Sequence, residues 1–253
     1  MAINDKEKQF HGENHDDTLK VSGAHKSDHF HGHSGSGEHA HHSDSLVYEL
    51  MCHFPYAIFS IAFGLILLSV FGYYSLNTTD LKMIKKGYKL LFHSFHFLHI
   101  VFAATGTVLT FLRFSNNMLR ALVVGVVSPI IFCMLSDVIM PYIGGLILGQ
   151  PMDFHICFIT EWKNVVPFLI IGIINGILLA KHYSAFGRFF SMGSHFVHIL
   201  ISTLASLFYM VSHGFVNWAN FMGPIFVVMI AAVVFPCTMS DVVVPMYFAR
   251  KRR

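Results

Sequence analysis

Two aspartates of this sequence, Asp137 and Asp241, lie inside copies of one pattern, C-x-x-S-D-V-x-x-P, which begins at Cys133 and at Cys237. Both copies fall within long apolar stretches. A carboxylate at membrane depth costs several kcal/mol unless it is paired, protonated or in contact with water, so such residues are functional candidates by default. We therefore take Asp137 and Asp241 as candidates for ion or proton binding, with the two cysteines as additional ligands.

Histidines recur in a second repeated pattern, H-F-x-H-I, which contains His96 and His99 in one copy and His195 and His198 in the other. Three residues before the first copy lies His93, so His93, His96 and His99 stack along one face of a helix. Imidazole, carboxylate and thiol groups together suit a borderline divalent ion such as Zn, Fe, Ni, Co or Mn. The same histidines and carboxylates are also suited to relaying protons.

A third pattern relates the two glutamates Glu49 and Glu161, each of which stands six residues before a proline, Pro55 or Pro167. Both are candidates for ion or proton binding, and His53 is an additional candidate ligand. Three matched patterns in the same order along each half indicate an internal duplication.

The elements that hold these residues are six apolar segments, at about 54–75, 91–112, 119–148, 165–181, 193–212 and 221–248. Hydrophobic residues make up 54% of the 253 and charged residues 12%, well below the charged share of a soluble domain. Each segment approaches or exceeds the roughly 20 residues needed to cross a bilayer. The sequence therefore predicts an all-α integral membrane protein with six transmembrane helices.

Two local features modify this prediction. The third and sixth segments contain prolines, so we expect them to be tilted, kinked or broken. The lysine-rich stretch 80–91 is amphipathic, and we expect it to lie on the membrane surface.

The duplication divides the membrane part into two three-helix repeats, 46–148 and 149–253. Three is an odd number of spans, so the two repeats must cross the membrane in opposite directions. This inverted topology is common in secondary transporters. Antiparallel packing within a repeat brings His96 and His99 toward Asp137, with Glu161 nearby. By the same argument His195 and His198 approach Asp241, which predicts two clusters that either stay separate or converge at the midplane.

Residues 1–45 form a polar tail that contains half of the 18 histidines. Its low complexity and lack of periodic apolar positions predict disorder. A flexible histidine tract can bind metal ions weakly without folding, so we expect this tail to gather or sense metal.

The basic residues 250–253 follow the last span, which predicts a cytoplasmic C-terminus. Six spans then place the tail in the cytoplasm as well, although the lysines of 80–91 fall on the opposite side. The start of the chain lacks the form of a cleaved signal peptide, and we expect a multi-pass protein of a bacterial inner membrane. An organellar membrane remains the alternative.

We conclude from the sequence that the chain transports a divalent transition-metal ion, which is its substrate or bound ion, with coupling to protons. A net charge of +3 gives no reason to expect nucleic acid, and the absence of a Walker A pattern gives none to expect ATP hydrolysis. The expected partners are the lipid bilayer and the metal ion, and a homo-oligomer is left open. We do not expect an enzyme. The alternatives are an intramembrane metalloenzyme, a haem or thiol redox carrier, and a proton-coupled transporter of another solute.

Overall fold

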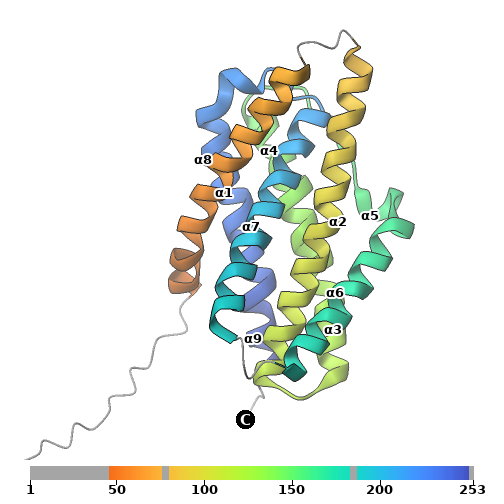
Figure 1. Cartoon of the computed structure of the whole chain (residues 1–253), viewed down its shortest axis with the longest axis vertical. Helices are drawn as coiled ribbons and strands as arrows, with labels where there is room; N and C mark the ends of the chain where they lie inside the picture. The colour runs from red at the N-terminus through yellow and green to blue at the C-terminus, as the bar shows by residue number, and fades with distance from the viewer. Residues whose placement is uncertain (1–45, 76–79, 183–186, 251–253) are drawn as a thin grey trace, which may run out of the picture. The chain divides into compact units, whose positions relative to one another are not determined.

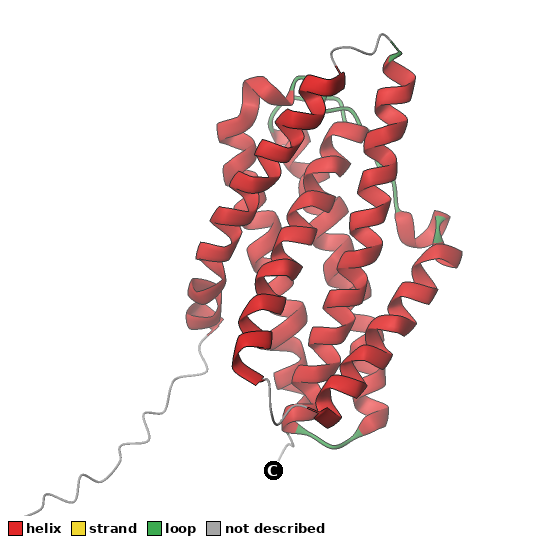
Figure 2. Cartoon of the chain, in the orientation of Figure 1, coloured by secondary structure: helices red, strands yellow, loops and turns green. Residues whose placement is uncertain are grey.

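The computed structural model describes residues 46–75, 80–182 and 187–250, which form helices and loops with no strand among them (Figure 1; Figure 2). The tail at 1–45 lies outside these residues. The first half contains α1 (Leu46–Ser75), α2 (Leu81–Phe114), α3 (Met118–Met134), the π-helix η1 (Leu135–Ile139) and α4 (Met140–Ile147). The second half contains α5 (Cys157–Thr160), α6 (Trp162–His182), α7 (Gly187–Ser212), the 3₁₀-helix η2 (Trp218–Phe221), α8 (Met222–Thr238), the π-helix η3 (Met239–Val243) and α9 (Val244–Ala249).

Six helical stretches are long and apolar enough to cross a membrane, which confirms the prediction of an all-helical chain with six such elements. They are Phe54–Ser75, Lys82–Phe114, Met118–Ile147, Trp162–Lys181, His195–Ser212 and Trp218–Ala249. Many large apolar side chains on them face outward; Leu119 and Ile147, for example, are 73% and 76% exposed. Lipid solvates a surface of this kind, whereas water would drive it to aggregate.

The lysine-rich stretch after Asp80 is the first part of α2 and not a separate surface helix, which corrects our expectation. The Asp80 carboxylate accepts hydrogen bonds from the backbone N–H groups of Lys82 and Met83 and so caps the helix. No proline follows within α2, and the helix continues without a break to Phe114.

Two of the membrane-length stretches, Met118–Ile147 and Trp218–Ala249, are interrupted at the same point of the repeated pattern. The π-helices η1 and η3 contain Asp137 and Asp241, and Pro141 and Pro245 lie at the start of the short helices that follow. In a π-helix the carbonyl of residue i pairs with the N–H of residue i+5. Proline has no N–H, so the carbonyl five residues before each of these prolines lacks its helical partner. These carbonyls belong to Ser136 and Ser240.

Side chains of other helices satisfy the carbonyls that the prolines leave free. The Ser206 hydroxyl donates to the Ser136 carbonyl at 3.0 Å, and the Thr107 hydroxyl donates to the Ser240 carbonyl, also at 3.0 Å. All four residues are buried. Each interrupted helix is therefore tied to the middle helix of the opposite half of the chain.

The helices α2 and α7 pack against each other at the centre of the bundle, and the first helix of each half packs on one of them (Figure 1). Glycines allow these close approaches. A Cβ atom on Gly64 of α1 would lie 2.8 Å from Leu207 of α7, and one on Gly176 of α6 would lie 2.9 Å from the Thr105 carbonyl of α2. The bundle thus places the buried faces of α2 and α7 together.

Candidate functional site

A buried aspartate, Asp137, joins two histidines of α2. Its Oδ2 atom accepts hydrogen bonds from His96 Nδ1 at 2.8 Å and from His99 Nδ1 at 2.7 Å. Its Oδ1 atom accepts hydrogen bonds from the hydroxyls of Ser136, at 2.7 Å, and Ser202, at 3.0 Å. All five side chains are buried, and the four hydrogen bonds satisfy the buried carboxylate.

A second buried aspartate, Asp241, has a different environment. Its Oδ2 atom accepts a hydrogen bond from His198 Nδ1 at 2.5 Å, whereas its Oδ1 atom has no hydrogen-bond partner among the described residues. Opposite the carboxylate lies Gly106 of α2, where a Cβ atom would be 3.0 Å from Asp241 Oδ2. Because Gly106 has no side chain, the Asp241 carboxylate can lie directly against α2.

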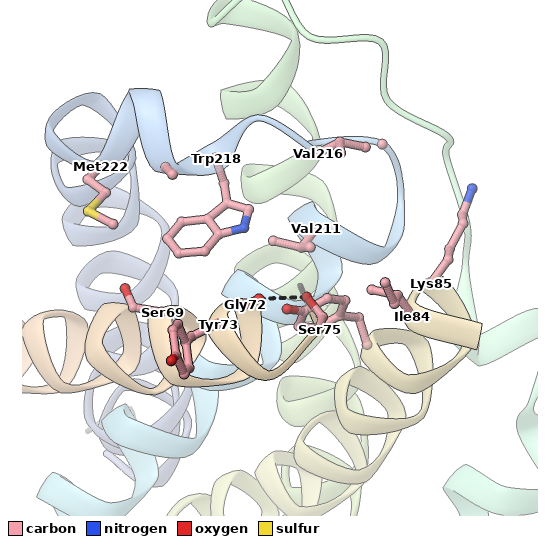
Figure 3. Close-up of a pocket in the computed structure, with 13 residues that line it drawn as sticks. Ser69, Gly72, Tyr73, Ser75, Ile84, Lys85, Val211, Val216, Trp218 and Met222 are labelled. Atoms are coloured by element: carbon pink, nitrogen blue, oxygen red, sulfur yellow. Dashed lines mark hydrogen bonds between the residues drawn. The ribbon is translucent and has the colours of Figure 1, made fainter. Parts of the chain in front are cut away.

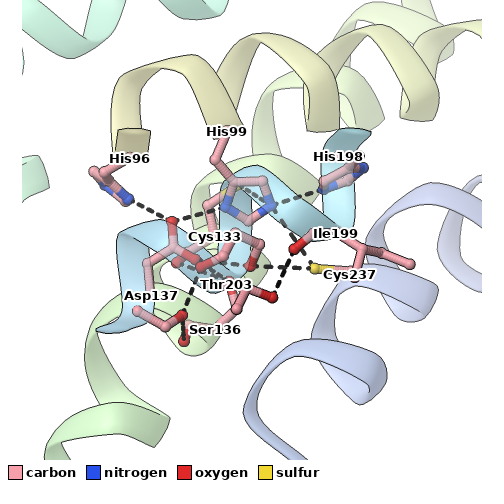
Figure 4. Close-up of polar contacts among 11 residues, drawn as sticks. His96, His99, Cys133, Ser136, Asp137, His198, Ile199, Thr203 and Cys237 are labelled. Carbon is pink, nitrogen blue, oxygen red and sulfur yellow. Dashed lines mark hydrogen bonds and ion pairs between the residues drawn. The ribbon is translucent and has the colours of Figure 1, made fainter. Parts of the chain in front are cut away.

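The histidines of the two aspartate–histidine pairs, His99 and His198, meet at the interface of α2 and α7 (Figure 4). The Nε2 atoms of His99 and His198 lie 2.7 Å apart, and the ring centroids are 4.7 Å apart. Asp137, His99, His198 and Asp241 therefore form one continuous chain, which we call the Asp–His–His–Asp chain. The sequence left open whether two clusters would stay separate or converge, and the structure joins them.

The tautomers of His99 and His198 follow from their partners. Each Nδ1 faces a carboxylate oxygen that can only accept, so each Nδ1 donates its proton. Both Nε2 atoms then present lone pairs to each other, which is unfavourable unless a proton or a metal ion lies between them. A carboxylate behind each imidazole is the arrangement that orients histidine ligands in metal sites.

Two thiols lie beside the same pair of nitrogens. The Sγ atoms of Cys133 and Cys237 are 3.9 Å and 3.8 Å from His99 Nε2. One ligand atom from each of His99, His198 and Cys237 lies within 4.8 Å of the other two, and all three residues are buried. Two imidazoles and one or two thiolates match the ligands of tetrahedral zinc, which would hold the two nitrogens about 3.3 Å apart. The residues present fit such an ion if the rings separate by about 0.6 Å.

A small cavity of about 80 Å³ adjoins the Asp241 end of the chain. Its lining includes His195, His198, Asp241, Arg113 and Asn175. His195 belongs to the same repeated pattern as His96, and it is partly exposed, whereas His96 is fully buried. The structure therefore gives the Asp241 end a small space, lined in part by polar side chains, that has room for water or an ion.

A larger groove, of about 770 Å³, lies elsewhere (Figure 3). Residues near the end of α1, the start of α2, the end of α7 and the η2 helix line it, among them Tyr73, Tyr88 and Trp218. Its lining contains none of the residues of the Asp–His–His–Asp chain, and its surface is mainly apolar. We therefore assign no chemistry to it.

Other predicted candidates lie outside this cluster. Glu161 caps the end of α5, and its carboxylate accepts a hydrogen bond from the Asn164 side chain at 2.7 Å. Among the described residues no hydrogen bond links Glu161 to Asp137 or to the histidines beside it, where we expected it to lie. His93 contacts His155 and not Asp137. Burial lowers the pKa of His155. The side chains of Glu49 and His53 lie outside the described part of the structure.

Sequence reasoning did not identify the hydroxyl groups that complete the site, notably Ser202, Ser206 and Thr107. A signal was present for two of them, since Thr107 and Ser206 are 99 residues apart, the same offset as His99 and His198. No repeated pattern pointed to Ser202, because its counterpart at the same offset is Ala103.

Comparison with known proteins gives no further guide to this site. No protein-family model, no curated protein and no solved structure matches the chain.

Proposed function

We propose that this protein is a proton-coupled transporter of a divalent transition-metal ion, held by His99, His198 and Cys237, with Cys133 as a further ligand. The observation that supports this most directly is the pair of buried Nε2 atoms, 2.7 Å apart, between two carboxylates and beside two thiols. Metal-binding histidines need a neutral nitrogen that faces the ion and a partner behind the other nitrogen. Both histidines of the pair meet these requirements.

Proton coupling follows from the same geometry. When no metal is bound, a proton between the two Nε2 atoms removes the repulsion of their lone pairs. A metal ion that binds there must displace this proton, and a thiol that becomes a ligand must release its own. The Asp241 Oδ1 atom, which has no hydrogen-bond partner in the described part of the chain, is a nearby acceptor for a released proton.

Inverted repeats are the second part of the proposal. Three pairs of features at equivalent positions support it: the π-helices η1 and η3, the hydroxyl bonds of Ser206 and Thr107, and the glycine contacts of Gly64 and Gly176. Two halves of this kind can exchange conformations and so expose a central site to either side of the membrane in turn. We place both termini in the cytoplasm of a bacterial cell, on the basis of the basic residues at 250–253.

Transport by reconstituted protein tests the proposal. Proteoliposomes containing the full chain would be loaded with a metal-sensitive dye and a pH-sensitive dye, and offered Zn, Co, Mn, Fe and Ni in turn. We expect uptake of at least one ion with opposite proton movement, and loss of both signals in Asp137→Asn and Asp241→Asn. The matched control is Asp153→Asn, because Asp153 is an exposed aspartate that pairs with Lys85.

One observation favours a second candidate. The Asp–His–His–Asp chain is a continuous series of hydrogen bonds, which is also what a proton path requires. If the proteoliposomes move protons along a gradient of another solute, and no divalent ion crosses, the metal proposal is wrong and this second candidate holds.

A further inference from the structure

A second group of potential ligands lies away from the Asp–His–His–Asp chain. It consists of His93 of α2, His155 of the loop before α5, and Cys157 at the start of α5. One ligand atom from each residue lies within 4.8 Å of the other two. The Cys157 side chain is fully buried, and the two histidines are partly buried.

His93 presents a nitrogen that has no partner. Its Nδ1 lies 2.9 Å from the Lys89 carbonyl, which can only accept, so Nδ1 donates its proton. Its Nε2 is then unprotonated, and this atom is buried without a hydrogen-bond partner among the residues that the structure describes. A buried acceptor without a partner is unfavourable, and a metal ion at this position would satisfy it.

The loop that contains His155 is fixed in place by the end of α7. The Asp153 backbone N–H donates to the His213 carbonyl at 2.6 Å, and the His155 backbone N–H lies 3.4 Å from the Tyr209 hydroxyl. Gly214 makes this approach possible: its φ is +130°, and a Cβ atom there would lie 2.1 Å from the Pro151 carbonyl oxygen. The His155 ring is thus held beside His93, with their centroids 5.8 Å apart.

The charges around the group are mixed. The Glu161 carboxylate interacts electrostatically with both His93 and His155 and favours a cation there. Lys89 interacts electrostatically with the same two histidines, and its positive charge disfavours a bound cation there. A divalent ion held by two imidazoles and a thiolate would keep a net charge of about +1, which Glu161 can offset.

We propose that His93, His155 and Cys157 form a second metal site, which takes a borderline divalent ion such as Zn or Co with an open fourth position. Imidazole and thiolate are both zinc ligands, and zinc sites with an open position combine three protein ligands of these kinds. The existence of this site does not depend on the proposed transport function, whereas its role as a station for the transported ion does.

The position of the site suggests that role. His93, His96 and His99 follow one another at intervals of three residues along α2, and His99 belongs to the central site. The Nε2 atom of His96, between the two sites, is also buried without a hydrogen-bond partner. An ion that leaves the second site would therefore meet another unpartnered imidazole before it reaches His99.

Cobalt binding to the full-length protein tests this inference. Cobalt bound to a thiolate gives a charge-transfer absorption band, and the histidine-rich tail cannot contribute to it, because the four cysteines are Cys52, Cys133, Cys157 and Cys237. Reduced protein in detergent would be titrated with cobalt without oxygen. We expect two binding phases in the wild type, one of which disappears in Cys157→Ala and weakens by at least about tenfold in His93→Gln.

The remaining phase shows that each variant is folded, and Asp153→Asn is the control for a change in the same loop. Retention of both phases in Cys157→Ala would overturn the inference, as would the absence of any band in the wild type. The effect of Cys237→Ala separates the two proposals. If it changes nothing while Cys157→Ala removes the whole band, the central metal site fails and the second site stands.

Discussion

Asp137 and Asp241 occupy the same position in two copies of one sequence pattern, yet their surroundings differ. Asp137 accepts four hydrogen bonds, from His96, His99 and two serines. Asp241 has a short hydrogen bond from His198, an oxygen without a partner, and a cavity beside it. One end of the Asp–His–His–Asp chain is therefore fully paired, and we call it the closed end. The other end has a buried oxygen without a partner among the described residues and a small cavity beside it, and we call it the open end.

Small differences between the repeats explain the contrast. Ser202, which donates to Asp137, has Ala103 as its counterpart near Asp241. Ser136 bonds to Asp137, whereas its counterpart Ser240 contacts the hydroxyls of Thr107 and Ser128. Loss of two hydroxyl donors leaves one carboxylate oxygen available. A few side-chain differences between the two copies of the pattern therefore make the two ends of the Asp–His–His–Asp chain unequal.

The largest effect should come from the link that joins the two ends. We expect His99→Gln and His198→Gln each to reduce metal flux by at least about 100-fold, because each removes a ligand and interrupts the chain. Flux into proteoliposomes measures this. His213→Gln, a change of a buried histidine directly after α7, is the control; an equal loss in that variant would show that the effect comes from damaged packing.

Removal of each aspartate should reveal the difference in pairing. Asp137→Ala leaves four buried donors without their acceptor, so we expect a loss of about 3–5 kcal/mol in unfolding free energy. Asp241→Ala leaves one buried donor and should cost about 1–3 kcal/mol. Thermal unfolding of both variants in the same detergent measures the two costs. Equal costs would mean that the two ends do not differ as described.

The Ser202 hydroxyl donates to Asp137 at the closed end, and it also accepts a hydrogen bond from the Cys237 thiol at 3.5 Å. We expect Ser202→Ala to lower the unfolding free energy by about 1–2 kcal/mol, because it leaves Asp137 Oδ1 with one donor in place of two. The measurement is again thermal unfolding, with Ser212→Ala as the control, since Ser212 is a buried serine at the end of the same helix. No difference between the two variants would contradict the assignment.

The smallest effect should come from closing the open end. Ala103→Ser supplies the hydroxyl that Asp241 lacks, and we expect a gain of about 0.5–1.5 kcal/mol in unfolding free energy together with slower transport. The combination of greater stability and lower flux is what distinguishes closure from simple disruption. A variant that is both less stable and slower would indicate that the serine does not reach Asp241.

The sequence was most informative about local structure. Apolar runs near 20 residues predicted six membrane-length helices, and the intervals of three between His93, His96 and His99 placed them on one helix. It was less informative about the stretch after Asp80, because the same amphipathic pattern suits a surface helix and the exposed start of a longer one. The cluster of His93, His155 and Cys157 followed from no spacing rule, since a loop brings its members together.

The sequence by itself determined which residues are repeated, and hence that two aspartates and two pairs of histidines would occupy equivalent positions. Only the tertiary structure decided that His99 and His198 meet at their Nε2 atoms and that Asp241 keeps one oxygen unpaired. The physical reason is that periodicity fixes the face of a helix on which a side chain lies, whereas the partner of that face depends on packing. Here, for example, the absence of a side chain at Gly106 of α2 lets Asp241 lie against that helix, and the pattern around Asp241 does not predict this contact.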